Sequence, residues 1–459
     1  MTNIKIELDN IIGKIKPMHA VNNGPSCKLN GIGTWDDHAR DLTNVRNGNL
    51  AEFKAAGIPY ARTHDSSFYA KYGLEHTIDV HAIFPNFDAD PYSPESYDFV
   101  CTDHYLDMIE AGGAKVFYRL GSRIEHEVKK YGTIVPKDYK KWAVICEHII
   151  RHCTEGWANG HHRDIEYWEI WNEPDLDPED STNKRCWSGT RQEFFDFYHV
   201  AATHLKGCFP HLKIGGPAAS GKIDWIEAFI AQCKAPLDFF SWHVYAHTIE
   251  KMKGRADKVR ELLDKYGFEK TESILNEWNY VLDWAGDKMT YSFLKQREAK
   301  GAAFNLAAMT MCQTGSVDML MYYDARPTSW NGLFDFMQLG KCTTTAYFAY
   351  PMFNTLYTLG NSTECASDNN DVYVCSARNG DEAAFFITHY NNDDENKGTE
   401  ISINLSGFSS KNGIEASFYL LDNEHDLTLT DSIVYFGNKV ILKRNLPNFT
   451  SYLVKLKKL

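Results

Sequence analysis

Residues 165–175 read IEYWEIWNEPD, and they decide the fold. Ile165–Trp171 is a short apolar and aromatic run, which is typical of a buried strand. Pro174 has no backbone N–H to donate to a sheet, so it helps to end the strand. Glu173 therefore lies where the strand runs out into its loop. The stretch predicts a buried strand that presents a carboxylate at its carboxyl end.

A second stretch repeats this arrangement. Residues 273–280 read SILNEWNY, in which the apolar segment Ser273–Leu275 leads to Asn276 and Glu277. Glu277 follows Glu173 by about three strand–helix units of roughly 35 residues each. Counting candidate strands independently puts Glu173 after the fourth and Glu277 after the seventh.

The first 360 residues repeat one rhythm of a short apolar segment, a polar loop and a longer amphipathic stretch. The candidate strands are Ile15–Ala20, Tyr60–Thr63, Lys115–Leu120, Ile165–Trp171, Lys213–Gly216, Phe239–Val244, Ser273–Leu275 and Val317–Tyr322. The candidate helices between them include Tyr105–Ala111, Tyr139–His152, Gln192–Lys206, Val259–Lys265 and Arg297–Thr310. Strands that alternate with helices pair in parallel, and eight such units close into a barrel. The sequence therefore predicts an α/β fold, a (β/α)8 TIM barrel, over residues 15–360.

The pattern changes after Gly360. The remaining chain has short alternating runs separated by Asn, Asp and Gly clusters: Val372–Ala377, Glu382–His389, Thr399–Asn404, Glu415–Asp422, Lys439–Lys443 and Thr450–Lys455. This pattern predicts a carboxy-terminal antiparallel β-sandwich over residues 361–459. The early strand Ile4–Leu8, within residues 1–14, precedes the barrel and is expected to join that sheet.

The two glutamates suit one kind of chemistry. In a (β/α)8 barrel the carboxyl ends of the strands carry the active site, and the fourth and seventh strands lie across its mouth. Two carboxyl groups that flank a scissile bond are what glycoside hydrolysis requires. One must be protonated and the other ionised, and their environments separate the two pKa values. The alternative, that both glutamates belong to ion pairs on the rim, fits less well because each has a Trp close by and lies on the expected strand.

At these residues the chain resembles the retaining (β/α)8 glycosidases, and within them glycoside hydrolase family 39, which includes β-xylosidases and α-L-iduronidases. The matching stretches are RTHD (Arg62–Asp65), WNEPD (Trp171–Asp175), IGGPA (Ile214–Ala218), DFFSWHVYA (Asp238–Ala246) and NEWN (Asn276–Asn279). The resemblance covers the barrel and extends to the β-sandwich, which that family also carries. It implies Glu173 as the acid/base and Glu277 as the nucleophile.

The resemblance also implies roles for the neighbours of the two glutamates. Asn172 would bind the 2-hydroxyl group of the sugar, and Arg62 would lie under Glu277 and help to keep it ionised. Tyr245 would donate a hydrogen bond to Glu277. His243, two residues before Tyr245, would touch the sugar or brace the pocket.

Other rim residues are weaker candidates. Asn23 follows the first strand and His64 the second, and each is as well suited to tie down a loop as to bind a ligand. Trp278 could stack on a sugar or form part of the barrel wall. Glu169 lies deeper on its strand and is interpreted as a buried structural carboxylate that needs a cation such as Arg62.

Two segments depart from the family pattern. Xylosidases of the family tend to carry Glu-Leu-Gly-Phe-Met-Pro after the third strand, where this chain reads RLGSRIEH, so that Arg119 replaces an acidic residue. Arg119 would read a uronic carboxylate or pair with Glu169 or Asp65. After the eighth strand, Asp324 and Trp330 are expected to line the leaving-group side. The departures leave the substrate open.

No metal or organic cofactor is expected. His161 and His162 suggest a metal site, but adjacent histidines point apart and no third ligand has useful spacing. They are interpreted as part of a surface loop on the amino-terminal side of the fourth strand. Eleven cysteines without a CxxC pair suggest neither a zinc site nor a disulfide framework.

Charge and composition exclude several classes of partner. The formal charge of −13 and the pI near 5.8 disfavour nucleic acids and anionic membranes. The sequence contains no run of 18 apolar residues, so it predicts no transmembrane helix. The first residues do not resemble a secretion signal. Scattered cysteines fit a cytoplasmic protein, although a removed signal peptide would also fit the sequence.

The functional expectation is a retaining glycoside hydrolase that acts by double displacement on oligosaccharides or glycosides, with a β-xylosidase-like exo-enzyme as first choice. Specificity for an α-L-arabinoside, a β-glucoside or β-galactoside, or a uronide stays open. A non-catalytic carbohydrate-binding barrel is the rival hypothesis. It fits less well because such proteins commonly lose one carboxylate, whereas this chain keeps both.

Overall fold

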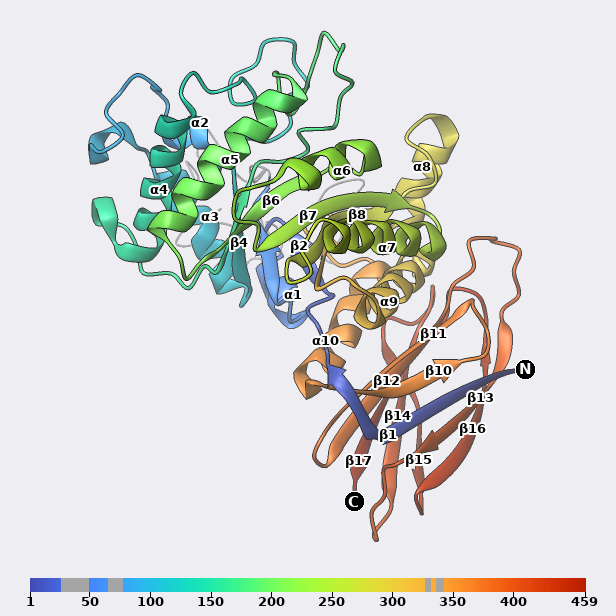
Figure 1. Ribbon diagram of the computed structural model, residues 1–459. Helices are drawn as coiled ribbons and strands as arrows, with labels where there is room; N and C mark the ends of the chain where they lie inside the picture. The colour runs from blue at the N-terminus through green and yellow to red at the C-terminus, as the bar shows by residue number, and fades with distance from the viewer. Residues whose placement is uncertain (26–48, 65–76, 327–331, 336–341) are drawn as a thin grey trace, which may run out of the picture.

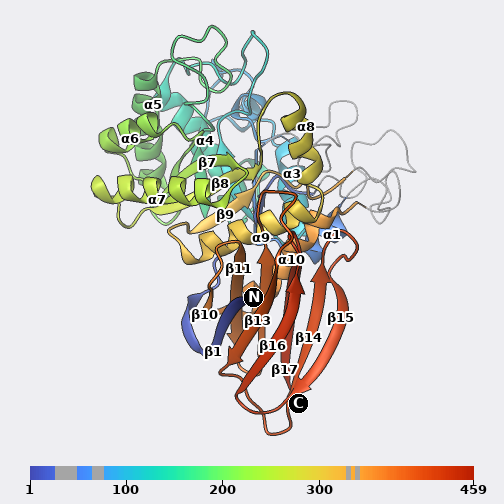
Figure 2. The ribbon, with the colours of Figure 1, turned by 90° about the vertical axis from the view of Figure 1, so that its right-hand side faces the viewer.

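The protein has a barrel surrounded by helices and, beside it, a large β-sheet (Figure 1). The computed structural model describes residues 1–25, 49–64, 77–326, 332–335 and 342–459. Asp65 and Trp330 therefore lie outside the described residues. The barrel and the sheet are two adjoining parts of the molecule that share buried apolar residues, and the turned view in Figure 2 shows them packed together.

Eight parallel strands form a closed barrel, in the order of the sequence: β2 (Ala20–Asn22), β3 (Tyr60–Arg62), β4 (Lys115–Leu120), β5 (Tyr167–Ile170), β6 (Lys213–Ala219), β7 (Phe239–Ala246), β8 (Glu272–Tyr280) and β9 (Met319–Tyr322). The predicted (β/α)8 barrel is confirmed. Glu173 follows the fourth barrel strand, β5, and Glu277 lies in the seventh, β8.

The predicted first strand, Ile15–Ala20, is wrong. The strand begins only at Ala20, because Pro17 has no N–H and the backbone N–H groups before it bind elsewhere: Ile15 donates to the Gly360 carbonyl and Lys16 to the Gln313 side chain.

Helices follow or precede most barrel strands. The α-helices are α1 (Leu50–Ala55), α2 (Val80–Ile83), α3 (Val100–Ala111), α4 (Tyr139–Glu155), α5 (Arg191–Cys208), α6 (Ile223–Gln232), α7 (Ile249–Lys265), α8 (Gly286–Lys295), α9 (Ala299–Thr314) and α10 (Ala349–Leu359), with short 3-10 turns at Pro94–Ser96, Trp157–Asn159 and Thr345–Phe348. Local signals explain several boundaries. At α5, for example, Thr190 and Glu193 form a reciprocal capping box.

Strand β8 is longer than expected and carries a β-bulge. The prediction ended its apolar part at Leu275, but the strand continues to Tyr280. Its pairing with β7 and with β9 slips after Leu275, so that β8 holds an extra residue at this point. A bulge lets two consecutive side chains turn to the same face, which strict alternation forbids. Asn276 and Glu277 consequently both face the barrel interior.

The second part is one nine-stranded sheet in the order β15-β14-β17-β12-β11-β10-β1-β13-β16. Its strands are β1 (Thr2–Lys14), β10 (Asn361–Ser367), β11 (Val372–Asn379), β12 (Glu382–His389), β13 (Thr399–Ser406), β14 (Ile414–Leu421), β15 (Thr428–Tyr435), β16 (Lys439–Leu446) and β17 (Ser451–Lys458). The sheet is mostly antiparallel, but β1 pairs in parallel with β13. Buried side chains of distant strands, such as Ile6 of β1 and Phe418 of β14, share one apolar core, as expected for a sheet folded into a sandwich.

The large core of the protein lies between the barrel strands and their helices, and α9 is buried along most of its length. A smaller apolar cluster fills the barrel beneath the site. It consists of Ala20, Phe117, Tyr167, Phe239, Ile274, Met319 and Met321. No helix in the described part of the chain is both long and apolar enough to cross a membrane.

Candidate active site

A buried arginine organises the polar layer above the apolar cluster. Arg62 of β3 donates from Nε to Glu169 Oε2 at 2.7 Å, and from Nη2 to Asn172 Oδ1 at 2.7 Å. Its Nη1 lies 2.9 Å from Asn22 Oδ1 and 3.5 Å from Glu277 Oε2. Arg62 and Glu169 have no exposed surface, and the charge of each compensates the other, as burial requires. The guanidinium thus contacts four side chains from three strands: Asn22 of β2, Glu169 and Asn172 of β5 and its carboxyl end, and Glu277 of β8.

Glu277 is held by an arginine, a histidine and a tyrosine. The Tyr245 hydroxyl donates to Glu277 Oε1 at 2.6 Å, while Arg62 Nη1 and His64 Nε2 each lie 3.5 Å from Oε2. Burial raises the pKa of Tyr245 well above its usual value, so the phenol stays protonated and acts as the donor. These groups hold the Glu277 carboxyl group in one orientation, with the phenol at Oε1 and the arginine and histidine near Oε2.

Glu173 has a different environment. It lies just past β5, where Trp171 and Glu173 have φ values of 78° and 47° and the Glu173 N–H donates to the Ala218 carbonyl. Left-handed conformations at non-glycine residues are uncommon and often mark functional sites. Burial raises the pKa of Glu173 to about 7, although the nearby cations His64 and Arg62 oppose the shift.

His243 of β7 joins the two carboxylates. Its Nδ1 lies 2.8 Å from Glu173 Oε1 and 3.6 Å from Glu277 Oε2. Burial lowers the pKa of His243 to about 4, so the ring is neutral near pH 7. A neutral imidazole shares one proton with Glu173: it donates to the carboxylate or accepts from the carboxylic acid.

The two carboxyl groups are close together. One oxygen of Glu173, one oxygen of Glu277 and one ring nitrogen of His243 all lie within 4.8 Å of one another. The site thus pairs a glutamate that burial drives towards its protonated form with one that a tyrosine donor and an arginine contact. Such a pair can deliver a proton and a nucleophile to opposite sides of one bond.

Arg119 pairs with a residue that the sequence did not suggest, while Asp65, one of its expected partners, lies outside the described residues. The Arg119 side chain has no exposed surface, and its Nη2 donates to the His64 carbonyl and, at 2.9 Å, to Asp79 Oδ1. Its partner is thus neither Glu169 nor a sugar carboxylate but Asp79, which precedes α2. Asp79 also accepts from the Arg123 backbone N–H. This ion pair joins the loops after β3 and β4.

Trp278 belongs to the barrel wall. It is fully buried, and its ring packs against Phe304 of α9 and Tyr322 of β9. The bulge explains its direction: because Asn276 and Glu277 both face inwards, Trp278 faces the helices. The alternative that it stacks on a sugar is therefore wrong.

Asn23 and Asp324 bind each other on the rim. Asn23 Nδ2 donates to Asp324 Oδ2 at 2.9 Å, and the Tyr105 hydroxyl donates to Asn23 Oδ1. Asp324 also accepts from Arg326 Nε at 2.7 Å. Both residues are buried, so they tie down the loops after β2 and β9. Trp330 lies outside the described residues.

Sequence reasoning missed two features of the site. Tyr323 of the segment after β9 packs its ring edge-on against His64, with centroids 5.4 Å apart. Asp175, directly after Pro174, is buried and accepts from the Ser220 and Lys222 backbone N–H groups, which joins the loops after β5 and β6. The signal for both was their position immediately after a barrel strand.

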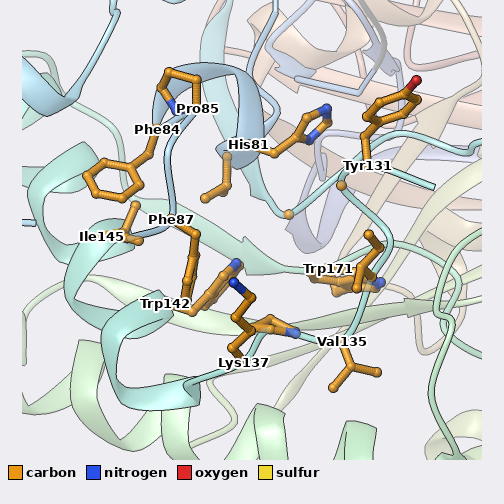
Figure 3. A pocket seen from close by; sticks show the side chains of 15 residues that line it. His81, Phe84, Pro85, Phe87, Tyr131, Val135, Lys137, Trp142, Ile145 and Trp171 are labelled. Carbon is orange, nitrogen blue, oxygen red and sulfur yellow. The ribbon is translucent and has the colours of Figure 1, made fainter. Parts of the chain in front are cut away.

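A separate cavity lies beside the site (Figure 3). It has a volume of about 210 Å³ and is lined by side chains that include Phe84, Phe87, Trp142 and Trp171. Neither Glu173 nor Glu277 lines it. Trp171 contributes its ring to this cavity, and its Nε1 donates to the Cys186 carbonyl, so it is a wall residue on this side of β5.

The histidine loop is more than a surface loop. His161 Nε2 lies 3.3 Å from Asp103 Oδ1, and His152 Nε2 lies 3.1 Å from the same oxygen. The sequence indicated no third ligand because the three residues come from α3, α4 and the loop before β5. As expected, His162 points elsewhere, with Nδ1 3.3 Å from the Thr154 carbonyl.

Comparison with known proteins places the chain among glycosidases. The model of glycosyl hydrolases family 39 matches residues 37–356. A β-xylosidase of Geobacillus stearothermophilus is 30% identical over 164 residues, and one of Caldicellulosiruptor saccharolyticus is 29% identical over 165 residues. These matches cover 32% and 33% of this chain and only 31% of each relative, so the chain matches about a third of the length of these curated relatives.

Solved structures match over the whole chain. A glucosidase of Croceicoccus marinus superposes with a TM-score of 0.75 at 20% identity, covering 100% of this chain and 99% of that one. A monomeric β-xylosidase of Caulobacter crescentus has a TM-score of 0.71 at 17% identity, with 100% of both chains covered. At these identities the likeness shows a shared fold.

Proposed function

Because the chain belongs to glycosyl hydrolases family 39, we propose that it is a retaining glycosidase with Glu277 as nucleophile and Glu173 as acid/base. The observation that carries the proposal is the carboxylate pair: one oxygen of each glutamate lies within 4.8 Å of the other, and burial raises the pKa of Glu173, the proposed acid, to about 7. Carboxyl groups about 5–5.5 Å apart are typical of retaining enzymes, whereas inverting enzymes leave room for a water molecule.

In the first step, Glu277 attacks the anomeric carbon while Glu173 transfers its proton to the departing glycosidic oxygen. The C–O bond of the substrate breaks, the aglycone leaves as an alcohol, and the sugar is esterified to Glu277. Tyr245 and Arg62 orient the attacking carboxylate, since each contacts one of its oxygens.

In the second step, Glu173 removes a proton from water, which attacks the anomeric carbon and releases Glu277 as a carboxylate. The change of role follows from electrostatics. Esterification removes the negative charge of Glu277, so the pKa of Glu173 falls and its carboxylate becomes the resting form. His243 Nδ1 lies 2.8 Å from Glu173 Oε1, so the ring orients the proposed acid/base.

Asn172 is suited to hold the sugar. Its Oδ1 accepts from Arg62 Nη2, and because arginine has no acceptor the amide orientation is fixed. The amide nitrogen therefore points away from Arg62, where it is available to donate to the 2-hydroxyl group of the sugar. Asn172 lies next to Glu173, at the level of the proposed reaction.

For the substrate we favour a β-D-xyloside, cleaved from a chain end. The two curated relatives are named β-xylosidases, and this is what supports the choice. Arg119, the residue that suggested a uronide, is engaged with Asp79, which weakens that alternative. An α-L-arabinoside, a β-glucoside or a β-galactoside remains an outcome of the test.

The test is hydrolysis of aryl glycosides (β-xyloside, α-L-arabinosides, β-glucoside, β-galactoside and α-L-iduronide) by the wild type, Glu173→Ala and Glu277→Ala. We expect the β-xyloside to be cleaved fastest. Glu277→Ala should be inactive on all of them. Glu173→Ala should keep activity on substrates with excellent leaving groups, and azide should accelerate it by intercepting the intermediate.

The comparison of the two variants decides between the hypotheses. If both variants behaved alike and neither responded to azide, the assignment of roles would be wrong. If the wild type cleaved none of the glycosides yet bound oligosaccharides, the chain would be a carbohydrate-binding barrel.

A further inference from the structure

A histidine–carboxylate cluster lies on the outside of the barrel, away from the carboxylate pair. Asp103 belongs to α3, His152 to α4, and His161 to the loop that leads to β5. One oxygen of Asp103 and one nitrogen of each histidine all lie within 4.8 Å of one another. The loop precedes the amino end of β5, whereas Glu173 follows its carboxyl end, so the cluster plays no part in the proposed reaction.

The hydrogen bonding of His152 leaves two acceptor atoms facing each other, its own Nε2 and Asp103 Oδ1. Its Nδ1 lies 3.0 Å from the Trp157 carbonyl oxygen, which can only accept, so Nδ1 carries a proton. In the neutral ring Nε2 then has a lone pair, and this atom faces Asp103 Oδ1 at 3.1 Å. A lone pair that faces a carboxylate requires a proton or a metal cation between them.

The distances fit a cation. Around a metal bound at ~2.0–2.1 Å, tetrahedral ligand atoms are about 3.3–3.4 Å apart. The Asp103 oxygen lies 3.1 Å from His152 Nε2 and 3.3 Å from His161 Nε2. The bond from Nδ1 to a backbone carbonyl is also the usual outer contact of a metal-binding histidine.

The surrounding structure holds the three groups in place. The Phe99 ring stacks on His152 at a centroid distance of 3.5 Å, which fixes the imidazole plane. The His161 N–H donates to the His152 carbonyl, and the Gly156 N–H donates to the His161 carbonyl. A side chain at Gly160 would collide with the His152 carbonyl oxygen, so the loop can lie this close only with glycine there.

The local charge also favours a cation. Asp107 and Glu110, which follow Asp103 on α3, both bind Arg163. Arg163 thus compensates these two carboxylates of α3, whereas Asp103 faces the two histidines. Among the described residues, one other such cluster lies outside the active site; it consists of Glu147, His204 and Cys208. It differs in charge, because Arg151 donates to Glu147 at 2.9 Å and already supplies a cation.

We propose that Asp103, His152 and His161 bind a divalent transition-metal ion, with Zn²⁺ as the best match. Two imidazoles and one carboxylate are ligands that Zn²⁺ prefers, with water in the fourth position. The ion would join α3, α4 and the loop before β5, and so stabilise the side of the barrel that carries the acid/base strand.

The test is calorimetric titration of chelator-treated full-length protein with Zn²⁺ at pH 7.5, using the wild type, Asp103→Asn and His161→Ala. His162→Ala is the matched control, because it removes the adjacent histidine, and His204→Ala and Glu277→Gln control for the other clusters. We expect one Zn²⁺ per chain, at least tenfold weaker binding in Asp103→Asn and His161→Ala, and a change of less than twofold in the three controls.

Two further measurements, the absorption of bound Co²⁺ and the melting temperature, keep the proposal testable if a variant folds poorly. Co²⁺ added to the wild type should give the visible absorption of a tetrahedral site, and Zn²⁺ should raise the melting temperature of the wild type and of His162→Ala but not of His161→Ala. Absence of Zn²⁺ binding would overturn the proposal, leaving a protonated His152 paired with Asp103. The proposal would also be overturned if Asp103→Asn and His161→Ala bound Zn²⁺ as tightly as the wild type. Loss of Zn²⁺ binding in His204→Ala or Glu277→Gln would overturn it as well, because the ion would then occupy another cluster.

Discussion

At the scale of single residues, the account depends on the unequal environments of Glu173 and Glu277. Glu173 reaches a pKa of about 7 because it is buried, while Glu277 is contacted by a tyrosine donor and an arginine. His243 lies between them and is neutral near pH 7, since burial lowers its pKa to about 4. The proton available for catalysis is therefore the one that Glu173 carries.

The raised pKa of Glu173 predicts a change of stability with pH. The folded state holds this proton more tightly than the unfolded state, so the stabilising contribution is present below pH ~4.5 and is lost as the pH rises through about 7. Glu173→Gln cannot ionise, so relative to the wild type it should gain stability between pH 4.5 and pH 8. The gain should be a few kcal/mol, at about 1.4 kcal/mol per pKa unit.

Urea unfolding of both proteins at pH 5 and pH 8 measures this difference. The same pKa predicts that kcat/KM of the wild type falls as the pH rises above 7, where the acid loses its proton. A stability difference that does not change with pH would show that Glu173 titrates near its ordinary value.

Tyr245→Phe tests the support of the nucleophile. Removing a hydrogen bond to a charged group costs about 1.5–3 kcal/mol. Because the phenol touches Glu277 Oε1 directly, kcat/KM should fall by roughly 10- to 150-fold. The melting temperature should change little, since the ring itself stays. Unchanged kinetics on the preferred aryl glycoside would mean that the 2.6 Å contact has no role in orienting Glu277.

At the scale of elements, the β8 bulge decides which residues face the site. It turns Asn276 and Glu277 inwards together and sends Trp278 to the helix layer. Trp278→Phe should therefore lower the free energy of unfolding and leave KM for the aryl glycoside within twofold of the wild-type value. Trp278→Ala should lose about 3–5 kcal/mol of stability. A Phe variant with normal stability and a strongly raised KM would show instead that the ring contacts the sugar.

The elements also show what sequence alone could predict. Strands with apolar runs, such as β4, β5 and β12, were found nearly in full, and so was the long helix α4. β10 was missed, because its sequence NSTECAS has no apolar alternation and the strand is held by pairing with β1 and β11. β15 was missed as well: most of its residues are exposed and give no core signal.

The candidate site was predictable where a residue's role follows from its place at a strand end. Glu173 and Glu277 could be named in this way, whereas the role of Tyr245 came from the resemblance to family 39. Arg119 could not, since its partner Asp79 lies 40 residues earlier and only the folded loops bring the two together. The cluster of Asp103, His152 and His161 was hidden for the same reason.

At the scale of the whole molecule, a buried lysine joins the barrel helices to the sheet. Lys300 of α9 is 2% exposed, and its Nζ donates to Asp394 Oδ1 at 2.8 Å and to the Asn392 carbonyl at 2.7 Å. It also contacts the Tyr291 hydroxyl. The two parts thus meet through a satisfied charge in an otherwise apolar helix.

Lys300→Met should lower the free energy of unfolding by about 1–3 kcal/mol, because it removes the charge-assisted hydrogen bonds of a buried ammonium group. Its kcat/KM should stay unchanged, since the contacts lie outside the active site. Lys295→Met is the control: Lys295 is partly exposed and pairs with Glu298, so its loss should cost less than about 1 kcal/mol. If both substitutions lowered the free energy of unfolding in urea by the same amount, Lys300 would contribute no more to stability than an exposed lysine.

The most direct test of double displacement through Glu277 is to trap the covalent intermediate. The wild type is incubated with a 2-deoxy-2-fluoro glycoside of the preferred sugar that carries a good leaving group, and the labelled peptide is identified by mass spectrometry. The account predicts stoichiometric addition of one fluorosugar, in ester linkage to Glu277, and loss of activity in proportion. A label on another residue, or turnover without any label and with inversion at the anomeric carbon, would contradict it.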